Sequence, residues 1–460
     1  MTARELASKV LGGTRTWVVG GAARDRVLGR ETDDLDLVLD GDVAAAARAL
    51  GRAGGGASFE LSDEFGAWRV VARDRRWQID VNPLRGGSLE ADLQRRDFTV
   101  NAIAEPLAGG EPIDPLGGLG DLRARRLRAA STHAFVDDPL RVLRLVRIAV
   151  ELGLEPDEAT IVDARRHATA LDGVAAERVF AELRRIVVAD EAVHGLDLLE
   201  ALTATDAVLP ELVALRGVEQ NRFHHRDVYG HTIEVLEAVI ELERDPAGAL
   251  GPEHAAALSG VLREPLSDDL TRGGALRFGA LFHDIAKPMT RAALPDGRVS
   301  FIGHDVEGAR IAREVLGRLR TSERLRAHVA ALGREHLRLG FLVHEVPVSR
   351  RSVFAYLRRC EPVEVDVTLL SVADRLATRG DRAEESIARH LALARAMIGD
   401  ALRWRDEGAP RPLLRGDELA RKAGLPPGPR IGELLEEMLA AQYAGELRTR
   451  ADALAWARDQ

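Results

Sequence analysis

The stretch "TDDLDLVL", Thr32 to Leu39, places two aspartates on alternate positions of an apolar run. In a β-strand, residues i and i+2 point to the same side, so we expect Asp34 and Asp36 to share one face. Two carboxylates on one face repel each other unless a cation lies between them or one of them is protonated. The spacing favours a divalent metal site; a turn cap beside a solvent-facing residue is the simpler alternative.

The residues before this run strengthen the metal interpretation. "TWVVGG" predicts a short strand that ends in Gly20 and Gly21, and Arg24 follows in the first turn of a predicted helix. Glycines let backbone amides approach a phosphate, and a helix N-terminus supplies partial positive charge. An ordinary tight turn explains the glycine pair alone. A strand, Gly-Gly, an arginine and then a D-x-D strand is the arrangement of a nucleotidyltransferase palm.

The periodicity along the chain predicts an α+β fold. "AWRVVA" and "RWQIDVNPL" predict two more strands, and helical spacing dominates after about residue 130. We therefore expect a small mixed sheet with helices, followed only by helical regions. The predicted domains are a palm over 1–130, a helical neck over 131–215, a helical bundle over 216–380 and a helical tail over 381–460.

The composition and the single cysteine fit a cytoplasmic protein. The chain has 460 residues, 46% of them hydrophobic, and a net charge of −9, which argues against a protein that coats nucleic acid. "RARRLR" (Arg123 to Arg128) and "SRRSVFAYLRR" (Ser349 to Arg359) are candidate basic tracks or solvated helix faces. Cys360 is the only cysteine, so no internal disulfide forms. No signal sequence and no membrane-spanning run are predicted.

A family resemblance covers roughly the first 220 residues as an ordered series of motifs. The chain resembles the class II tRNA nucleotidyltransferase/poly(A) polymerase family in "GGAARDRVLGRETDDLDLVL", "RRDFTVNAIA", "IDPLGGLGDLRARRLR", "DDPLRVLRLVRIAVELGL" and "AAERVFAELRRI". The resemblance implies that Asp34 and Asp36 hold catalytic Mg²⁺, with Asp80 as a weaker candidate. The predicted nucleotide-binding residues are Gly20, Gly21, Arg24, Arg96, Asp97, Asn101, Asp138, Arg141, Arg144 and Arg147. A surface ion pair is the alternative for Arg96 and Asp97.

The "DDPLR" segment offers a physical account of base selection. Pro139 suits the first position of a helix, which makes Asp138 a natural N-cap, and Arg141 is expected on the same face as Asp138. Cytosine and adenine both present an amino group beside a ring acceptor, which a carboxylate and a guanidinium match. Uracil and guanine present the reverse pattern, and each buried mismatch costs roughly 1–3 kcal/mol. Asp137 stands where the family motif has glutamate, which puts the orienting role of that position in question.

A second set of residues resembles the HD superfamily of metal-dependent phosphohydrolases. In that superfamily, histidines and aspartates from separate helices hold one or two divalent ions, here Mg, Mn, Ni or another metal, and acidify a bound water. The matching residues are His231, His283, Asp284 and Asp374, with Lys287, His304 and His336 as supplementary members. The alternative is a bundle in which these side chains are simply hydrogen-bonded.

The tail "GDELARKAGLPPGPRIGELLEEML" resembles the C-terminal segment of family members that carry an HD domain. Amides near Gly428 and Pro429 are candidates to hold an RNA phosphate, and a plain helix start is the alternative.

Together these features predict template-independent transfer of CMP and AMP, from CTP and ATP, to the 3′ end of tRNA. The terminal 3′-hydroxyl would attack the α-phosphate and release pyrophosphate. The alternatives within this class are a poly(A) polymerase and a partial enzyme that adds only CC or only A. An alternative of another class is an HD phosphohydrolase whose palm only binds nucleotides. The sequence predicts no particular oligomeric state.

Overall fold

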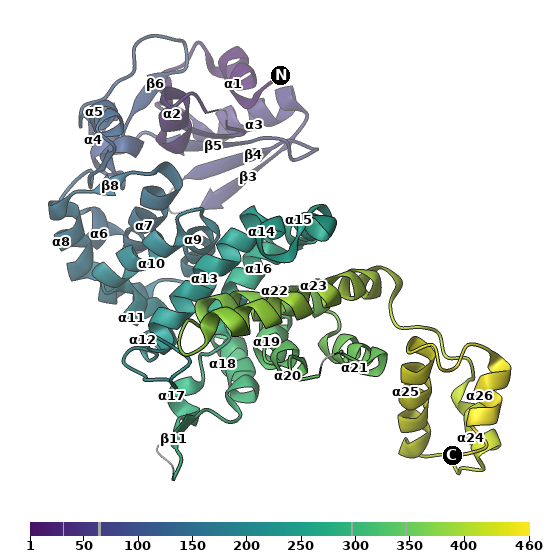
Figure 1. Ribbon diagram of the computed structural model, residues 1–460. Helices are drawn as coiled ribbons and strands as arrows, with labels where there is room; N and C mark the ends of the chain where they lie inside the picture. Colours follow the sequence, from purple (N-terminus) through teal and green to yellow (C-terminus); the bar gives the residue numbers. More distant parts are fainter. Residues whose placement is uncertain (31, 63–65, 296–297, 346) are drawn as a thin grey trace. The chain divides into compact units, whose positions relative to one another are not determined.

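The computed structural model describes residues 1–30, 32–62, 66–295, 298–345 and 347–460 (Figure 1). The chain forms two compact units, Met1–Val208 and Leu209–Gln460. The first contains a mixed sheet with helices, and the second is almost entirely helical. This confirms the predicted α+β fold. None of the described helices is both long and apolar enough to span a bilayer.

A six-stranded sheet forms the start of the first unit. The strand order is β3-β4-β5-β2-β1-β6; β2 and β5 pair in parallel and the other pairings are antiparallel. The strands are β1 (Thr16–Val19), β2 (Asp34–Leu39), β3 (Ala57–Ser62), β4 (Ala67–Val71), β5 (Gln78–Pro83) and β6 (Ala104–Pro106). The sequence predicted β1, β2, β4 and β5, but it missed β3 and β6.

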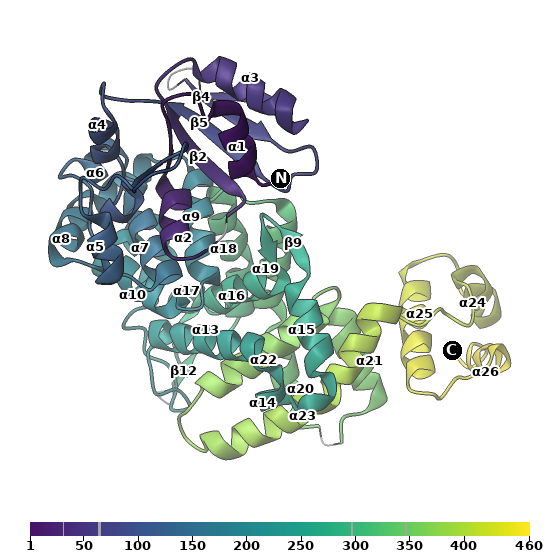
Figure 2. The same cartoon turned by 90° about the horizontal axis from the view of Figure 1, so that it is seen from above.

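The alternation along β2 assigns its two faces. Leu35, Leu37 and Leu39 are buried in a core with α1 (Ala3–Leu11) and α3 (Val43–Gly54). Figure 2 shows these two helices beside the central strands. Because side chains alternate, Asp34, Asp36 and Val38 face the other way. Val38 joins a smaller core there with Leu89 and Leu93 of α4 (Leu89–Gln94).

Helices complete the first unit. A buried apolar stripe on α7 (Arg141–Leu152) packs against α9 (Ala176–Val188) and α10 (Ala192–Ala201). The remaining elements are α2 (Gly20–Val27), η1 (Thr99–Asn101), α5 (Gly118–Arg123), β7 (Arg126–Leu127), α6 (Ala134–Asp137), β8 (Glu155–Pro156), α8 (Glu158–His167), η2 (Ala168–Gly173) and α11 (Ala204–Val208).

The second unit is built around α16 (Arg272–Phe282). All eleven residues of α16 are buried, which is typical of a helix surrounded by other helices. It packs against α13 (Val228–Arg244), α19 (Glu323–Glu335) and α22 (Glu364–Ala377). The other elements are α12 (Pro210–Val213), α14 (Pro246–Leu250), η3 (Pro252–His254), α15 (Ala255–Arg263), β9 (Pro265–Ser267), β10 (Leu270–Thr271), α17 (Lys287–Thr290), β11 (Ala292–Ala293), β12 (Val299–Ser300), α18 (His304–Arg318), α20 (Arg338–Leu342), α21 (Arg350–Cys360) and α23 (Ala383–Glu407).

The segment predicted as a tail, 381–460, has two parts. Helix α23 packs along α22 and so extends the bundle. The last three helices, α24 (Gly416–Ala423), α25 (Pro429–Tyr443) and α26 (Arg450–Trp456), enclose a small core of their own. The predicted domain boundaries stay predictions.

Candidate active site

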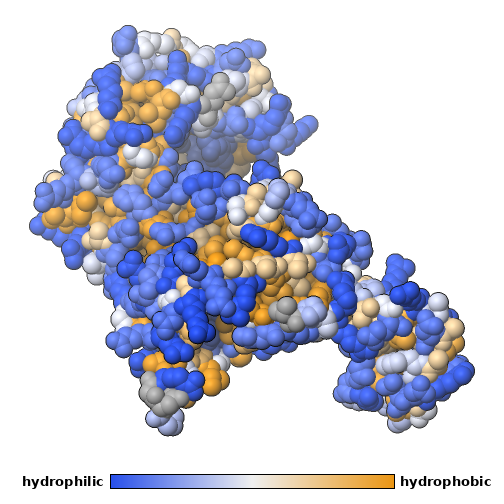
Figure 3. Space-filling view, viewed as in Figure 1, coloured by the Kyte–Doolittle hydropathy of each residue, from blue (hydrophilic) through white to orange (hydrophobic). Residues whose placement is uncertain are grey.

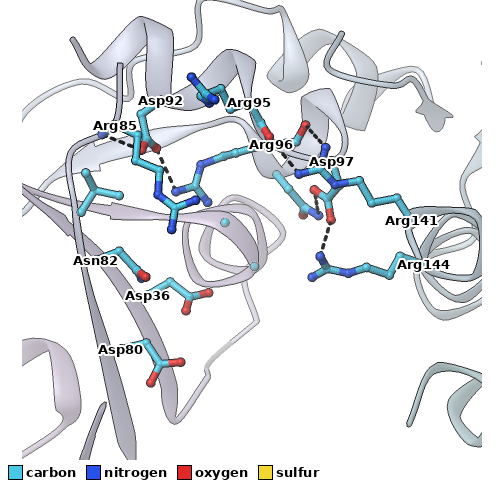
Figure 4. Close-up of a pocket in the computed structure, with 14 residues that line it drawn as sticks. Asp36, Asp80, Asn82, Arg85, Asp92, Arg95, Arg96, Asp97, Arg141 and Arg144 are labelled. Atoms are coloured by element: carbon cyan, nitrogen blue, oxygen red, sulfur yellow. Dashed lines mark hydrogen bonds and ion pairs between the residues drawn. The ribbon is translucent and has the colours of Figure 1, made fainter. Parts of the chain in front are cut away.

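A cavity of about 390 Å³ lies in the first unit, on the polar face of the sheet. Figure 4 shows its side chains converging from the sheet, from the segment after β5 and from α7. Strands β2 and β5 supply acidic side chains on one wall, and arginines lie on the opposite wall. The lining residues are Gly20, Gly21, Asp36, Val38, Asp80, Asn82, Arg85, Asp92, Arg95, Arg96, Asp97, Asn101, Arg141 and Arg144.

The acidic wall has Asp36 and Asp80 at its centre. These residues are partners in the register of the parallel strands β2 and β5, so their carboxylates lie side by side (Figure 4). Asp34 is exposed on the same face and is not part of the cavity lining. Arg69 binds both oxygens of Asp80, at 2.7 and 2.8 Å. Burial, together with the neighbouring Asp80 charge, raises the pKa of Asp36 to about 6.

Gly20 brings the start of α2 against this carboxylate. Its φ is +67°, a conformation that strongly favours glycine. A Cβ atom at Gly20 would lie 3.2 Å from Oδ2 of Asp36 and 3.3 Å from Nη1 of Arg96. The crowded carboxylates and the close backbone suit a cation, because a positive charge would offset the repulsion that raises the Asp36 pKa. The palm residues therefore fit Mg²⁺.

The basic wall presents several guanidinium groups to the cavity. Arg96 donates to Asp92 at 3.2 Å, and Arg144 pairs with Asp97 at 3.3 Å, so Arg96 and Asp97 each have a separate partner. The Nε–H groups of Arg96, Arg141 and Arg144 are buried, and none has a hydrogen-bond acceptor among the described residues. A phosphate oxygen is the type of acceptor that these donors lack.

Asp97 connects the basic wall to α2 through a hydrogen bond with Asn101. It accepts hydrogen bonds from the backbone N–H of Phe98 at 2.8 Å and from Nδ2 of Asn101 at 3.0 Å. Burial alone would raise the pKa of Asp97, but the Arg144 guanidinium and these hydrogen bonds hold it below its usual value. Arg24 donates to Oδ1 of Asn101 at 2.7 Å and does not line the cavity. Arg24 thus orients the Asn101 side chain from outside the cavity lining.

A second cluster of ionisable side chains lies in the other unit. The cluster comprises His231, His283, Asp284, His304, His336 and Asp374, which we call the histidine cluster. Within the described ranges, two groups of three ligand atoms lie within 4.8 Å of one another, and both belong to this cluster. Asp284 is at its centre, with Nε2 of His283 at 3.2 Å and Nε2 of His304 at 3.3 Å. The predicted HD residues are therefore brought together.

Backbone contacts fix the orientation of three of these imidazoles. Nδ1 of His283, His304 and His336 lies 2.6–2.8 Å from the carbonyl oxygens of Ala280, Phe301 and Gly333. A carbonyl only accepts, so each Nδ1 carries the proton, and Nε2 of a neutral imidazole keeps its lone pair. The Nε2 atoms of His304 and His336 face each other at 3.4 Å, and Nε2 of His283 is buried beside Oδ2 of Asp284. Such a donor set fits a divalent metal.

Charges around the cluster favour an ionised Asp284. Burial opposes its charge, but His283 and Lys287 hold the pKa of Asp284 well below its usual range. Nζ of Lys287 lies 2.6 Å from Asp284 and also donates to Oε1 of Gln220 at 2.6 Å. Burial, together with the nearby His283, lowers the pKa of His336 to about 4, which keeps that imidazole neutral.

Comparisons with known proteins match the segments in which the two groups of residues lie. Family models match as "Poly A polymerase head domain" over 16–128, "Probable RNA and SrmB- binding site of polymerase A" over 153–215 and "HD domain" over 228–379. An A-adding tRNA nucleotidyltransferase from Deinococcus radiodurans is 37% identical, covering 95% of this chain and 94% of the relative. The chain belongs to the tRNA nucleotidyltransferase/poly(A) polymerase family. It is a nucleotidyltransferase with an HD domain.

Two further relatives support the family and the fold. A CC-adding tRNA nucleotidyltransferase from Thermus thermophilus is 36% identical to this family member, over 95% of this chain and 92% of the relative. The solved structure of the Thermotoga maritima CCA-adding enzyme complexed with tRNA superposes with a TM-score of 0.63. That structure is 20% identical and covers 99% of this chain and 93% of its own. The fold of the nucleotidyltransferase is therefore that of a CCA-adding enzyme.

Of the two residues predicted to select the base, Arg141 lines the cavity of this family member and Asp138 does not. Arg141 donates to the backbone carbonyls of Arg95 at 2.9 Å and Ala134 at 3.0 Å. Asp138 is outside the lining, where it accepts from the backbone N–H of Leu140 and from Arg178. Helix α7 begins at Arg141, so Asp138 caps the turn before the helix rather than the helix itself. The base-selection role of both residues stays a prediction.

Arg147, Gly428 and Pro429 are not among the residues that line the cavity described above. Arg147 is buried between Glu182 and Glu151 and joins α7 to α9. Gly428 and Pro429 are exposed at the start of α25. The predicted binding roles of these residues also stay predictions.

The sequence analysis missed four polar residues of the nucleotidyltransferase cavity, Asn82, Arg85, Asp92 and Arg95. Asn82 follows Asp80 by two positions on β5, so strand periodicity gave a signal for it. Arg85 and Asp92 lie beyond β5, where no periodicity indicates the direction of a side chain. Asp92 accepts from the backbone N–H of Arg85 at 3.2 Å, which fixes that segment against the cavity.

Proposed function

We propose that this nucleotidyltransferase adds CMP and AMP, from CTP and ATP, to the 3′ end of tRNA. The observation that carries the proposal is the pairing of Asp36 with Asp80 on one wall of a cavity whose other wall is arginine-rich. That cavity lies in the segment that matches the poly(A) polymerase head domain. Carboxylates suit catalytic Mg²⁺, and guanidinium groups suit a triphosphate.

In the proposed reaction, the 3′-hydroxyl of the RNA attacks the α-phosphate and pyrophosphate leaves. Asp34 and Asp36 would hold Mg²⁺, which when bound supplies positive charge beside the hydroxyl and the phosphates. Arg96 and Arg144 bind phosphate oxygens and neutralise charge on the leaving group. The backbone amides of Gly20 and Gly21 approach the phosphates because glycine has no side chain that would separate backbone and phosphate.

Base selection is proposed to use Asp138 and Arg141. Both side chains have protein partners, since Arg178 binds Oδ2 of Asp138 at 2.8 Å and Arg141 binds backbone carbonyls. A cytosine or adenine amino group would replace Arg178 as the donor to Asp138. Exchange of one charge-assisted partner for another keeps the cost of desolvation low.

Incorporation by the purified protein tests the proposal. The substrates are tRNAs that end before CCA, after C and after CC, each offered with one labelled nucleoside triphosphate. Addition of two C residues and then A supports the full reaction. Addition of C alone or A alone would place the protein with its CC-adding or A-adding relatives. Long A tails on unrelated RNA would indicate a poly(A) polymerase, and no incorporation would contradict the proposal.

A second activity, metal-dependent phosphoester hydrolysis, is proposed for the histidine cluster. The supporting observation is that His283, His304 and His336 turn Nε2 inward while the backbone holds Nδ1. These residues with Asp284 would hold a divalent metal, which when bound supplies an acidified water. Phosphate release after chelation and separate return of Mg²⁺, Mn²⁺ and Ni²⁺ tests this activity. Equal release with and without metal would contradict it.

A further inference from the structure

A cavity of about 720 Å³ lies in the second unit. A separate cavity of about 580 Å³ opens onto the cluster itself, and the two share Phe223 and Arg375 in their linings. We call the larger one the arginine cavity, because it is lined by Arg222, Phe223, Gly340, Val343, His344, Arg375, Asp381, Arg382, Ser386, Arg389 and His390. No residue of this cavity has a role in the functions proposed above.

The lining of the arginine cavity carries a net positive charge. Four arginines face one lining carboxylate, Asp381, which lies 3.8 Å from Nε of Arg222. Arg389 also lies 3.9 Å from the carboxylate of Glu385. Arg382 makes no side-chain hydrogen bond or ion pair with the part of the chain that the structure describes, and it is the N-cap of the 25-residue α23. The Nε–H of Arg375 is buried and lacks an acceptor among the described residues. Cationic side chains beside a helix N-terminus attract phosphate.

The wall between the two cavities is held in place by backbone contacts. The amides of Gly380 and Asp381 donate to the carbonyls of Phe223 at 2.8 Å and Arg222 at 3.2 Å. A Cβ atom at Gly380 would lie 2.4 Å from the carbonyl oxygen of Arg222, so only glycine permits this approach. Phe223 is thus fixed between the histidine cluster and the arginines.

Apolar side chains surround the mouth of the histidine-cluster cavity. Phe223 is 43% exposed, Phe341 is 63% exposed and Ile302 is 86% exposed, and all three line this cavity. Figure 3 shows apolar surface near α17 and β11, which flank this region. Exposed aromatic rings next to cationic groups are the usual platform for an unpaired base.

We propose that this pair of cavities binds a single-stranded RNA end through two successive phosphates. One phosphate lies at the histidine cluster, the next lies among Arg375, Arg382 and Arg389, and a base stacks on Phe223. A mononucleotide reaches only the first position. The proposal deepens the hydrolase function proposed above, and its binding half does not depend on hydrolysis.

Calorimetry on the full chain in EDTA tests the binding half. The probes are AMP and the dinucleotide ApAp, which carries two phosphates. The variant R382A/R389A removes two exposed arginines of the cavity, and R382K/R389K keeps their charge. The control R310A removes an exposed arginine of α18 that pairs with Glu307 and Glu314 and lines neither cavity.

We expect R382A/R389A to weaken ApAp binding about tenfold and to leave AMP binding unchanged. The slope of log affinity against log salt should fall by about 0.7 units for ApAp, because the contacts of these arginines to one phosphate are lost. R382K/R389K and R310A should bind both probes within about twofold of the original protein. Equal ApAp binding by R382A/R389A and the original protein would overturn the proposal.

Three further outcomes separate the parts of the proposal. Inorganic pyrophosphate that matches ApAp in affinity, with the same loss in R382A/R389A, would overturn RNA as the ligand. If no metal supports phosphate release but the ApAp effect is present, binding stands and the hydrolase function falls. R382A/R389A could bind ApAp as tightly as the original protein and release phosphate from it at the same rate. That result would leave the hydrolase function intact and overturn the second phosphate site.

Discussion

At the scale of single residues, Asp36 shows how the proposed site works against the stability of the fold. The ordinary pKa of this carboxyl, 3.8, rises to about 6 in the folded chain because of burial and the neighbouring Asp80. Between these pH values the native state binds more protons than the unfolded state. Ionisation of Asp36 therefore lowers the free energy of unfolding as the pH rises from about 4 to 6, and the full cost is present at pH 7.

We therefore predict that Asp36→Asn stabilises the metal-free protein. Urea unfolding at pH 7 in EDTA should give a free energy of unfolding about 1–3 kcal/mol higher than that of the original chain. Mg²⁺ should stabilise the original chain more than the variant, because only the original has the full carboxylate set. A variant that is less stable than the original chain in EDTA would contradict the predicted cost of ionising Asp36.

Gly20 and Gly29 form a matched pair for a second prediction. Both have positive φ, +67° and +70°, but a Cβ atom at Gly20 meets Asp36 and Arg96, whereas one at Gly29 meets nothing within 4 Å. Alanine at either position should cost about 1–2 kcal/mol of stability. Only Gly20→Ala should lower kcat/KM for nucleotide addition, by about ten- to a hundredfold. Equal kinetics of the two variants would argue against close approach at Gly20.

At the scale of secondary-structure elements, periodicity decided what the sequence could predict. The alternation in β2 correctly placed Asp36 on the face opposite the core of Leu35, Leu37 and Leu39. Strand β3 was missed although Phe59 and Leu61 alternate with polar residues; it is an edge strand, and both of these apolar side chains are exposed. Strand β6 has only three residues, too few for a period.

Segments between elements gave no comparable signal. The position of Arg85 depends on the hydrogen bond from its backbone N–H to Asp92, and no local sequence pattern predicts this contact. No local pattern predicts the contact of Arg178, on α9, with Asp138 either. The family resemblance predicted roles for Asp138 and Arg141. The protein groups that bind these two side chains come together only through tertiary packing.

Arg141 connects α7 to the segment that carries the arginines of the cavity. We predict that Arg141→Ala lowers the free energy of unfolding by about 1–3 kcal/mol, because it leaves the carbonyls of Arg95 and Ala134 without a donor. Arg185→Ala is the control, since its exposed pair with Glu151 should contribute less than about 1 kcal/mol. Equal loss in both variants, measured by urea unfolding, would show that Arg141 does not hold the segment.

At the scale of the whole molecule, the two proposed chemistries lie in different units. The proposed palm residues fall within Met1–Val208 and the histidine cluster falls within Leu209–Gln460. The sequence predicted the cluster because the adjacent His283 and Asp284 occur in order with His231 upstream and Asp374 downstream. It could not predict the arginine cavity, because Arg222, Arg375 and Arg389 come from separate segments with no shared spacing.

This separation predicts independent loss of the two activities. Asp284→Asn should abolish metal content and phosphate release by the histidine cluster, because it removes the central charge, and should change nucleotide addition by less than about twofold. His254→Ala, a histidine outside the cluster, is the control for both assays. Metal analysis and the two activity assays on one preparation check this. Loss of nucleotide addition in Asp284→Asn would contradict independence.

The most direct test of the central claim is the rate of nucleotide addition by the variant that lacks both Asp34 and Asp36. Single-turnover incorporation of labelled CMP into tRNA that ends before CCA should fall at least about a thousandfold in Asp34→Ala/Asp36→Ala. Binding of that tRNA should be retained, and Asp284→Asn should add nucleotides at the original rate. Incorporation by the double variant at the original rate would contradict the account.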